Sequence, residues 1–127
     1  MGSARLTIDL EAVQQNWAAL DALSGPGVET AAVVKADAYG LGATKVAQAL
    51  AAKGVRSFFV ALAEEGRAIR KALGPDPDIY VFSGHMAGDT EVLEEAALIP
   101  MLNAPEQVVR HFGKAPGTPS GCNLIPA

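Results

Sequence analysis

Four short apolar runs, each separated from the next by a segment with helical periodicity, constrain the fold of this 127-residue chain more than any other feature. Each run is rich in aliphatic or aromatic residues and is bounded by turn residues, as expected of strands buried on both faces. The runs cover residues 29–35, 56–61, 78–82 and 98–102. Since strand–helix units with short connections form right-handed crossovers, we predict an α/β fold with a parallel sheet. Four such units amount to about half of a TIM-type (β/α)8 barrel.

The segments between these runs repeat apolar residues at the spacing of amphipathic helices. The expected helices begin near residues 10, 43, 64, 89 and 103. The first of them carries Trp17, which we assign to packing rather than to a site. Ahead of it, residues 5–8 alternate polar and apolar side chains, which predicts a short leading strand. At the other end, residues 123–127 resemble the start of a further strand.

The first apolar run ends at Lys35, and a stretch containing Gly40 and Gly42 leads from it into the next expected helix. This order places the lysine at the carboxyl end of a parallel strand, where α/β proteins build their sites. An amine at the edge of an apolar core is partly desolvated, so it can attack a carbonyl group and form a Schiff base. The following helix offers free N–H groups to a phosphate, and Tyr39 adds a hydroxyl group. These features suit an aldehyde cofactor that carries a phosphate.

Two other interpretations of this stretch stay open, and a third fails. Lys35 could be a solvated residue that only ends its strand. Gly40 and Gly42 could form half of a dinucleotide-binding fingerprint with Glu64 as the ribose ligand, although Lys45 then occupies the third glycine position and Lys35 has no role. A phosphate-binding loop around Lys45 fails, because the glycine before it and the hydroxyl residue after it are both missing.

Residues 33–42, Val-Val-Lys-Ala-Asp-Ala-Tyr-Gly-Leu-Gly, resemble the pyridoxal-phosphate lysine motif of the alanine racemase family. Residues 4–10, with Asn16, also resemble the start of that family's sequences. The resemblance runs along the whole chain but covers only the amino-terminal part of the family's sequence. It implies a (β/α)8 barrel followed by a β domain to which the leading strand belongs. We therefore expect residues 1–9 to form a leading extended segment and residues 10–127 to form an incomplete barrel domain.

The resemblance also implies roles for individual residues. Lys35 corresponds to the lysine that forms the Schiff base with pyridoxal 5'-phosphate, and Tyr39 to the residue that contacts the cofactor phosphate. Val33 and Phe82 match apolar positions that line the cofactor pocket, although an aliphatic residue is common where Phe82 stands. The implied reaction is the interconversion of L-alanine and D-alanine by two-base proton transfer, which supplies D-alanine for cell-wall peptidoglycan.

Parts of the family's machinery have no counterpart in this sequence. The opposing base of the family is a tyrosine from the other subunit, but only Tyr39 and Tyr80 occur here, and we expect Tyr80 in the core. The arginine that faces the pyridine nitrogen lies in the later part of the family's sequence. We therefore expect this chain alone to be inactive. The alternative is a non-catalytic fragment that binds pyridoxal phosphate or only oligomerises.

Half a barrel leaves both edges of its sheet open, with unpaired N–H and C=O groups beside apolar side chains. Something must cover these edges, since such edges pair readily with other chains. We expect either a homo-oligomer or an association with the missing remainder of the barrel.

Composition argues against several other classes of function. The net charge of −4 and the lack of a basic cluster argue against binding to nucleic acid or to an anionic membrane surface. No apolar stretch is long enough to span a membrane and no signal-peptide core is present, so we expect a cytoplasmic protein. The single cysteine, Cys122, excludes a disulfide within the chain, and we expect an inert thiol and no metal site. We assign His85 and Asp37 to loop structure and His111 to the solvated face of a helix.

Overall fold

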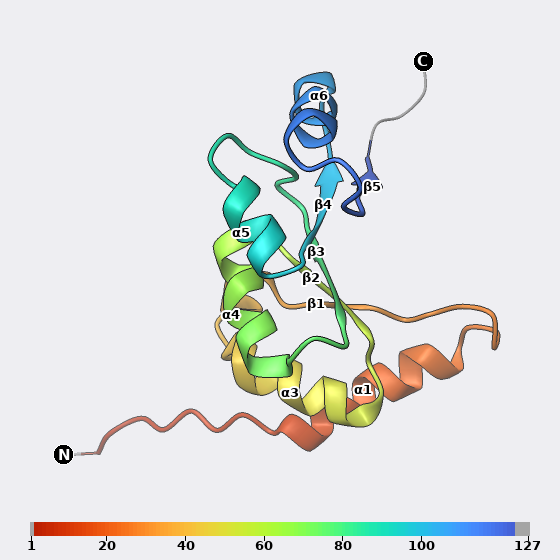
Figure 1. The fold of residues 1–127 in the computed structure, drawn as a ribbon. Coiled ribbons are helices and arrows are strands. Elements are labelled where there is room, and N and C mark those ends of the chain that lie inside the picture. Colours follow the sequence, from red (N-terminus) through yellow and green to blue (C-terminus); the bar gives the residue numbers. More distant parts are fainter. Residues whose placement is uncertain (1, 124–127) are drawn as a thin grey trace.

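The computed structural model describes residues 2–123 as helices and strands that alternate around one parallel sheet (Figure 1). The helical segments are α1 (Leu10–Ala22), α2 (Lys35–Tyr39), α3 (Ala43–Lys53), α4 (Ala63–Leu73), α5 (Thr90–Glu95) and α6 (Pro105–Lys114). The strands are β1 (Ala32–Val33), β2 (Ser57–Val60), β3 (Asp78–Val81), β4 (Ile99–Leu102) and β5 (Gly121–Cys122). The strands lie side by side in sequence order and all neighbours are parallel, which confirms the predicted α/β class and its half-barrel arrangement.

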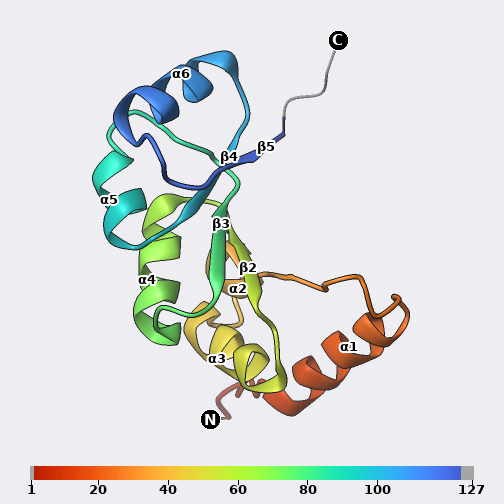
Figure 2. The same ribbon diagram turned by 45° about the vertical axis from the view of Figure 1, so that its right-hand side comes forward.

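Helices α3, α4 and α5 cover one face of the sheet and bury the core between themselves and the strands (Figure 2). Phe58 and Val60 of β2, with Ile79 and Val81 of β3, are completely buried there. Burial of each such side chain stabilises the fold by about 1.5–3 kcal/mol. Because successive residues of a strand face opposite sides of the sheet, the residues between these four lie on the other face.

That other face of the sheet is partly open and carries a row of aromatic rings. The Phe59 ring stacks on the Tyr80 ring with 4.6 Å between centroids and on the Phe82 ring with 5.1 Å. All three residues are half-buried, so the expectation that Tyr80 lies in the core is met only in part. In a closed barrel this face would be the interior, which side chains fill, and a barrel site would lie at the carboxyl ends of its strands.

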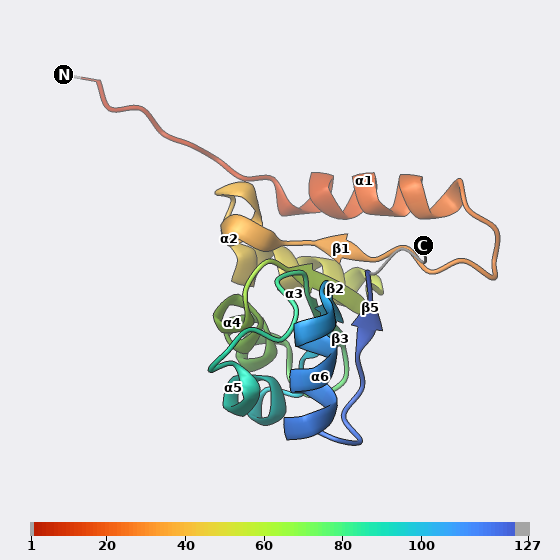
Figure 3. The same cartoon turned by 90° about the horizontal axis from the view of Figure 1, so that it is seen from above.

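Helix α1 packs against α3 and runs beside β1 at the edge of the sheet (Figure 3). The carboxylate of Asp9 caps its first turn by accepting a hydrogen bond from the Ala12 N–H at 3.1 Å. Trp17 packs against the core and donates its indole N–H to the Thr30 carbonyl at 2.9 Å. The prediction that Trp17 serves packing is confirmed.

Two expectations about secondary structure and burial are wrong. Residues 5–8 form no strand, because the sheet formed by residues 2–123 runs only from β1 to β5 and offers them no partner. His111 is buried at 1% exposure, whereas Val109 and Phe112 of the same helix are 75% and 58% exposed. The reason is that the face of α6 turned to the body of the protein meets polar groups around His85, and within the described residues no later helix covers the opposite face. The expected strand at 123–127 falls mainly on residues 124–127, which lie outside the described residues.

Candidate active site at Lys35

Lys35 lies two residues beyond the carboxyl end of β1, close to where the sequence predicts it, and is half-buried rather than fully solvated. Its Nζ atom lies 5.8 Å from the centroid of the Phe82 ring, a cation–π distance. Phe82 follows the carboxyl end of β3, so the structure brings together two of the residues that the sequence proposes for a cofactor site. Val33 ends β1 and is 42% exposed.

The segment after Lys35 is a turn of left-handed backbone rather than an ordinary helix. Ala36, Asp37 and Ala38 have φ of 52–55° and ψ of 44–49°, and Tyr39 has φ of 56°. Left-handed helical backbone costs residues other than glycine about 1–2 kcal/mol each. Four consecutive residues in this conformation must therefore be held by interactions from outside the turn. Gly40 follows at φ of 87°, which glycine adopts without strain.

Two carboxylates hold this left-handed turn. Asp37 accepts a hydrogen bond from the Ala43 N–H at the start of α3, with 2.8 Å between Oδ1 and the nitrogen. Glu65 of α4 accepts one from the Ala36 N–H at 2.8 Å. Asp37 is thus a structural loop residue, as predicted. The sequence analysis missed Glu65, whose contact with Ala36 joins residues far apart in the chain.

Asp37 occupies one of the N–H groups that α3 would offer to a phosphate. The Ala43 N–H already points to a carboxylate, and the negative charge of Asp37 at the start of α3 opposes a second anion there. Tyr39 ends the turn with 64% exposure, which leaves its hydroxyl group accessible. The dinucleotide interpretation also loses support, because Glu64 points to solvent and pairs with Arg67 at 3.7 Å.

His85, which follows β3, and His111 of α6 form a buried pair. Their Nδ1 atoms lie 3.1 Å apart, and His85 Nε2 lies 2.7 Å from the Thr90 hydroxyl. His111 Nε2 faces the Thr118 carbonyl, which can only accept, so a neutral His111 accepts at Nδ1 from His85. Burial, followed by the positive charges of His111 and Arg110, lowers the pKa of His85. His85 is therefore a structural residue of its loop, and complete burial keeps it from the open face.

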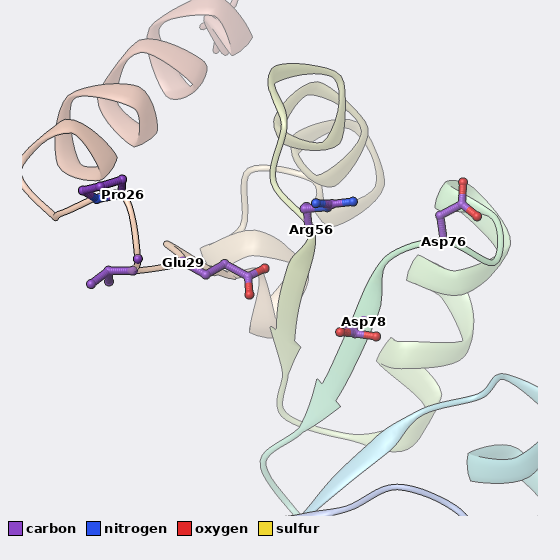
Figure 4. Close-up of a pocket in the computed structure, with 7 residues that line it drawn as sticks. Pro26, Glu29, Arg56, Asp76 and Asp78 are labelled. Carbon is purple, nitrogen blue, oxygen red and sulfur yellow. The ribbon is translucent and has the colours of Figure 1, made fainter.

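A charged depression lies at the opposite ends of the strands (Figure 4). Glu29, Arg56, Asp76 and Asp78 line it, and the last two stand just before or at the start of β3. Barrel proteins carry their chemistry at the carboxyl ends of their strands. This depression is thus on the side away from Lys35 and contributes nothing to the candidate site. In residues 2–123 there is no helix whose length and apolar character would let it cross a membrane.

Comparison with known proteins gives one family. A sequence model described as "Alanine racemase, N-terminal domain" matches residues 8–124. An alanine racemase of Cereibacter sphaeroides is 56% identical over 124 residues, which are 98% of this chain and 36% of that protein. One of Rhodospirillum rubrum is 47% identical over 85% of this chain and 29% of that protein. This chain thus spans about a third of the length of the curated relatives that it matches.

Solved structures give the same result. The crystal structure of alanine racemase from Bartonella henselae with covalently bound pyridoxal phosphate aligns with a TM-score of 0.80 and 34% identity, over 89% of this chain and 32% of that chain. Alanine racemase from E. faecalis aligns with a TM-score of 0.79 and 27% identity, over 91% of this chain and 32% of that chain. The family model covers most of the sequence, and the fold agrees with it. This chain belongs to the alanine racemase family, of which it matches the amino-terminal domain.

Proposed function

We propose that this chain is the cofactor-binding amino-terminal part of an alanine racemase, with Lys35 as the amine that bonds to the aldehyde of pyridoxal 5'-phosphate. The observation that carries the proposal is the place of Lys35, half-buried at the end of β1 with its amine over Phe82. The Bartonella henselae relative is described with covalently bound pyridoxal phosphate. The reaction that we assign to the whole protein is the interconversion of L-alanine and D-alanine in the cytoplasm, for cell-wall peptidoglycan.

The residues around Lys35 suit this cofactor chemically. A primary amine is the group that condenses with an aldehyde. Val33 and Phe82 offer apolar surface to an aromatic ring, and the accessible hydroxyl of Tyr39 can donate a hydrogen bond to a phosphate. When bound, pyridoxal phosphate supplies an electron sink for the charge that forms at the substrate Cα.

In the reaction, the Lys35 amine would take a proton at Nζ from one face of the alanine Cα, and the ammonium group formed in this way would return a proton to that face in the reverse direction. Phe82 and Val33 supply apolar surface on the side of Lys35 that is open in this chain, which lowers the polarity around its amine. The left-handed turn fixes the backbone that follows Lys35 and so limits the directions in which its Nζ atom can point. These three contributions come from residues of this chain alone.

The base for the opposite face has no candidate among the residues of this chain. Only Tyr39 and Tyr80 occur, and Tyr39 is assigned to the phosphate. Tyr80 stacks on Phe59, and burial, followed by the negative charges of Asp78 and Glu29, raises its pKa, which makes the phenolate scarcer. We therefore propose that the chain by itself does not racemise alanine.

The partner that completes the site is also a proposal. We assign residues 1–9 to a leading segment and residues 10–127 to an incomplete barrel. The edge strands β1 and β5 have two residues each, and the face with Phe59 and Phe82 is partly open. These features favour an arrangement in which the remainder of the barrel or a second copy of the chain covers the edge strands and the open face. They equally support the alternative function, a fragment that binds the cofactor or oligomerises without catalysis.

Absorbance titration with pyridoxal phosphate tests the proposal. We expect a saturable new visible band with the wild-type chain and with Lys45→Arg, a control on α3, and none with Lys35→Arg. An equal band in Lys35→Arg would contradict the assignment of Lys35. An assay of D-alanine formed from L-alanine by the loaded chain tests the proposed inactivity, since a measurable rate would show that the chain is catalytic by itself.

A further inference from the structure

The carboxylate of Glu65 receives three backbone N–H groups from the ends of two strands. Its Oε1 atom accepts from Ala61 and Leu62, both at 2.9 Å, just after β2. Its Oε2 atom accepts from Ala36 at 2.8 Å, just after β1. A single side chain therefore ties the backbone that follows Lys35 to the carboxyl end of the neighbouring strand.

Part of this arrangement is ordinary helix capping, and part is not. Glu65 is the third residue of α4, and a glutamate at that position commonly reaches back to the N–H group of the residue before its helix, here Leu62. Capping uses only Oε1. The bond from Oε2 to Ala36 spans 29 residues and adds nothing to α4 itself. The donor, Ala36, is the first residue of the left-handed turn and follows Lys35 directly.

Packing alone does not hold this turn against the body of the protein. A hollow of about 170 Å³ lies beside it, lined by Val34, Asp37, Ala43, Glu65 and neighbouring residues of α3 and α4. The turn therefore has room to relax toward ordinary backbone when its hydrogen bonds are lost. Since Lys35 is joined to Ala36 by a peptide bond, relaxation there would move the lysine.

We propose that Glu65 is a positioning residue for Lys35, which it serves by fixing the Ala36 N–H and thereby the direction of the lysine side chain. The inference rests on the proposed function, in that Lys35 is taken as the residue that bonds to the cofactor. Glu64 offers a matched control, because it lies in the same first turn of α4 and its side chain is 69% exposed. A glutamine in place of Glu65 keeps the size of the side chain but turns one accepting oxygen into a donating NH2 group.

Two readouts test the role in the 127-residue chain. The first is the yield of borohydride-trapped pyridoxal phosphate on Lys35 relative to Lys45 in the same molecules. The second, which needs no cofactor, is the hydrogen-exchange rate of the Ala36 amide. For Glu65→Gln we expect the labelling ratio to fall and the exchange rate to rise, each by about tenfold, as for loss of one charge-assisted hydrogen bond. For Glu64→Gln we expect both to stay within about twofold, since a solvated glutamate contributes little.

The outcomes separate this proposal from the proposed function. A folded Glu65→Gln chain with the wild-type labelling ratio and the wild-type Ala36 exchange rate would overturn the positioning role. A wild-type chain without preference for Lys35 would contradict the proposed function, while the Ala36 exchange rate would still decide whether Glu65 holds the turn. If Glu65→Gln does not fold, Glu65→Asp replaces it, because a side chain one methylene shorter cannot span the same three donors. A core variant away from the hollow, Ile79→Val, with an expected stability loss of about 0.5–1.5 kcal/mol, shows whether destabilisation by itself lowers the ratio.

Discussion

The Nζ atom of Lys35 lies 5.8 Å from the centre of the Phe82 ring, although the two residues follow strands that are separated by β2. The side chain of Lys35 thus reaches past the end of β2 toward the residue that follows β3. Phe82 also stacks on Phe59 at 5.1 Å, so its ring is held from one side and faces the amine with the other. The place of the lysine therefore depends on a strand that is distant in the sequence.

Replacement of Phe82 by alanine should weaken both the fold and the site. The ring is half-buried, so we expect the free energy of unfolding to fall by about 1–2 kcal/mol, less than for a fully buried phenylalanine. We also expect weaker binding of pyridoxal phosphate, measured by absorbance titration. Phe82→Leu is the control, because it keeps an apolar side chain. Equal affinity for the cofactor in all three chains would exclude Phe82 from the site.

Replacement of Arg70 tests what joins α4 to the loops at its carboxyl end. Its guanidinium donates to the carbonyl groups of Ala96, Ala97, Gly74 and Pro77 at 2.7–3.0 Å. Arg70→Met leaves these oxygens without that donor, so we expect a loss of about 2–4 kcal/mol in urea unfolding.

Arg67→Met, on the same helix, is the control for Arg70→Met. Arg67 is about half exposed and only pairs with Glu64 and Glu95, at 3.7 and 3.8 Å. We expect a change below about 0.5 kcal/mol for it. Similar losses of stability in the two variants would contradict the role given to Arg70.

Gly84 should tolerate alanine far less well than Gly88. Both have positive φ, 77° and 90°, so alanine is strained at either position by about 1 kcal/mol. A Cβ atom at Gly84 would also collide with the Gln107 side-chain oxygen and lie 2.7 Å from the Met101 carbonyl oxygen, whereas one at Gly88 meets open space. We expect Gly84→Ala to cost about 2–4 kcal/mol in thermal or urea unfolding. Equal losses of stability in the two variants would show that Gln107 and Met101 do not pack closely against Gly84.

The stability of the chain should depend on pH through His85. The pKa of His85 is lowered in the folded chain by burial and by the charges of His111 and Arg110, against opposing effects of Asp89 and Glu94. The unfolded chain then binds a proton at a higher pH than the folded chain does. The stabilisation is complete above about pH 6.5, the ordinary histidine pKa, and is lost as the pH falls below it.

Urea unfolding at several pH values between about 7.5 and 5 measures this effect, since most carboxylates titrate below that range. We expect the free energy of unfolding to fall steadily with pH in the wild-type chain. In His85→Gln we expect a lower free energy of unfolding that changes less with pH. A flat wild-type curve would contradict the lowered pKa of His85.

The sequence predicts the strand–helix units and the place of Lys35 because these depend on local patterns. Apolar periodicity and turn residues recur within about ten residues, and they mark where β1 ends and α3 begins. The contacts that complete the site are not local. Glu65 meets Ala36 across 29 residues, and His85 meets His111 across 26. No spacing rule gives such pairs, which explains why Glu65 was missed and His111 was placed in solvent.

The left-handed turn was also beyond prediction in its details. Ala36, Ala38 and Tyr39 are residue types that avoid positive φ, so their sequence favours another conformation. The two carboxylates of Asp37 and Glu65 override that preference. Strained backbone next to the lysine that we propose for the cofactor is consistent with a site in which position outweighs local stability.

The central claim is that Lys35, among the lysines of this chain, is the one that bonds to pyridoxal phosphate. Its most direct test is incubation of the 127-residue chain with the cofactor, reduction with borohydride, and peptide mapping of the modified lysines by mass spectrometry. We expect the label to concentrate on Lys35 and to disappear from that peptide in Lys35→Ala. Labelling spread evenly over Lys45, Lys53, Lys71 and Lys114 as well would contradict the claim, because Lys35 would then react no differently from an ordinary surface lysine.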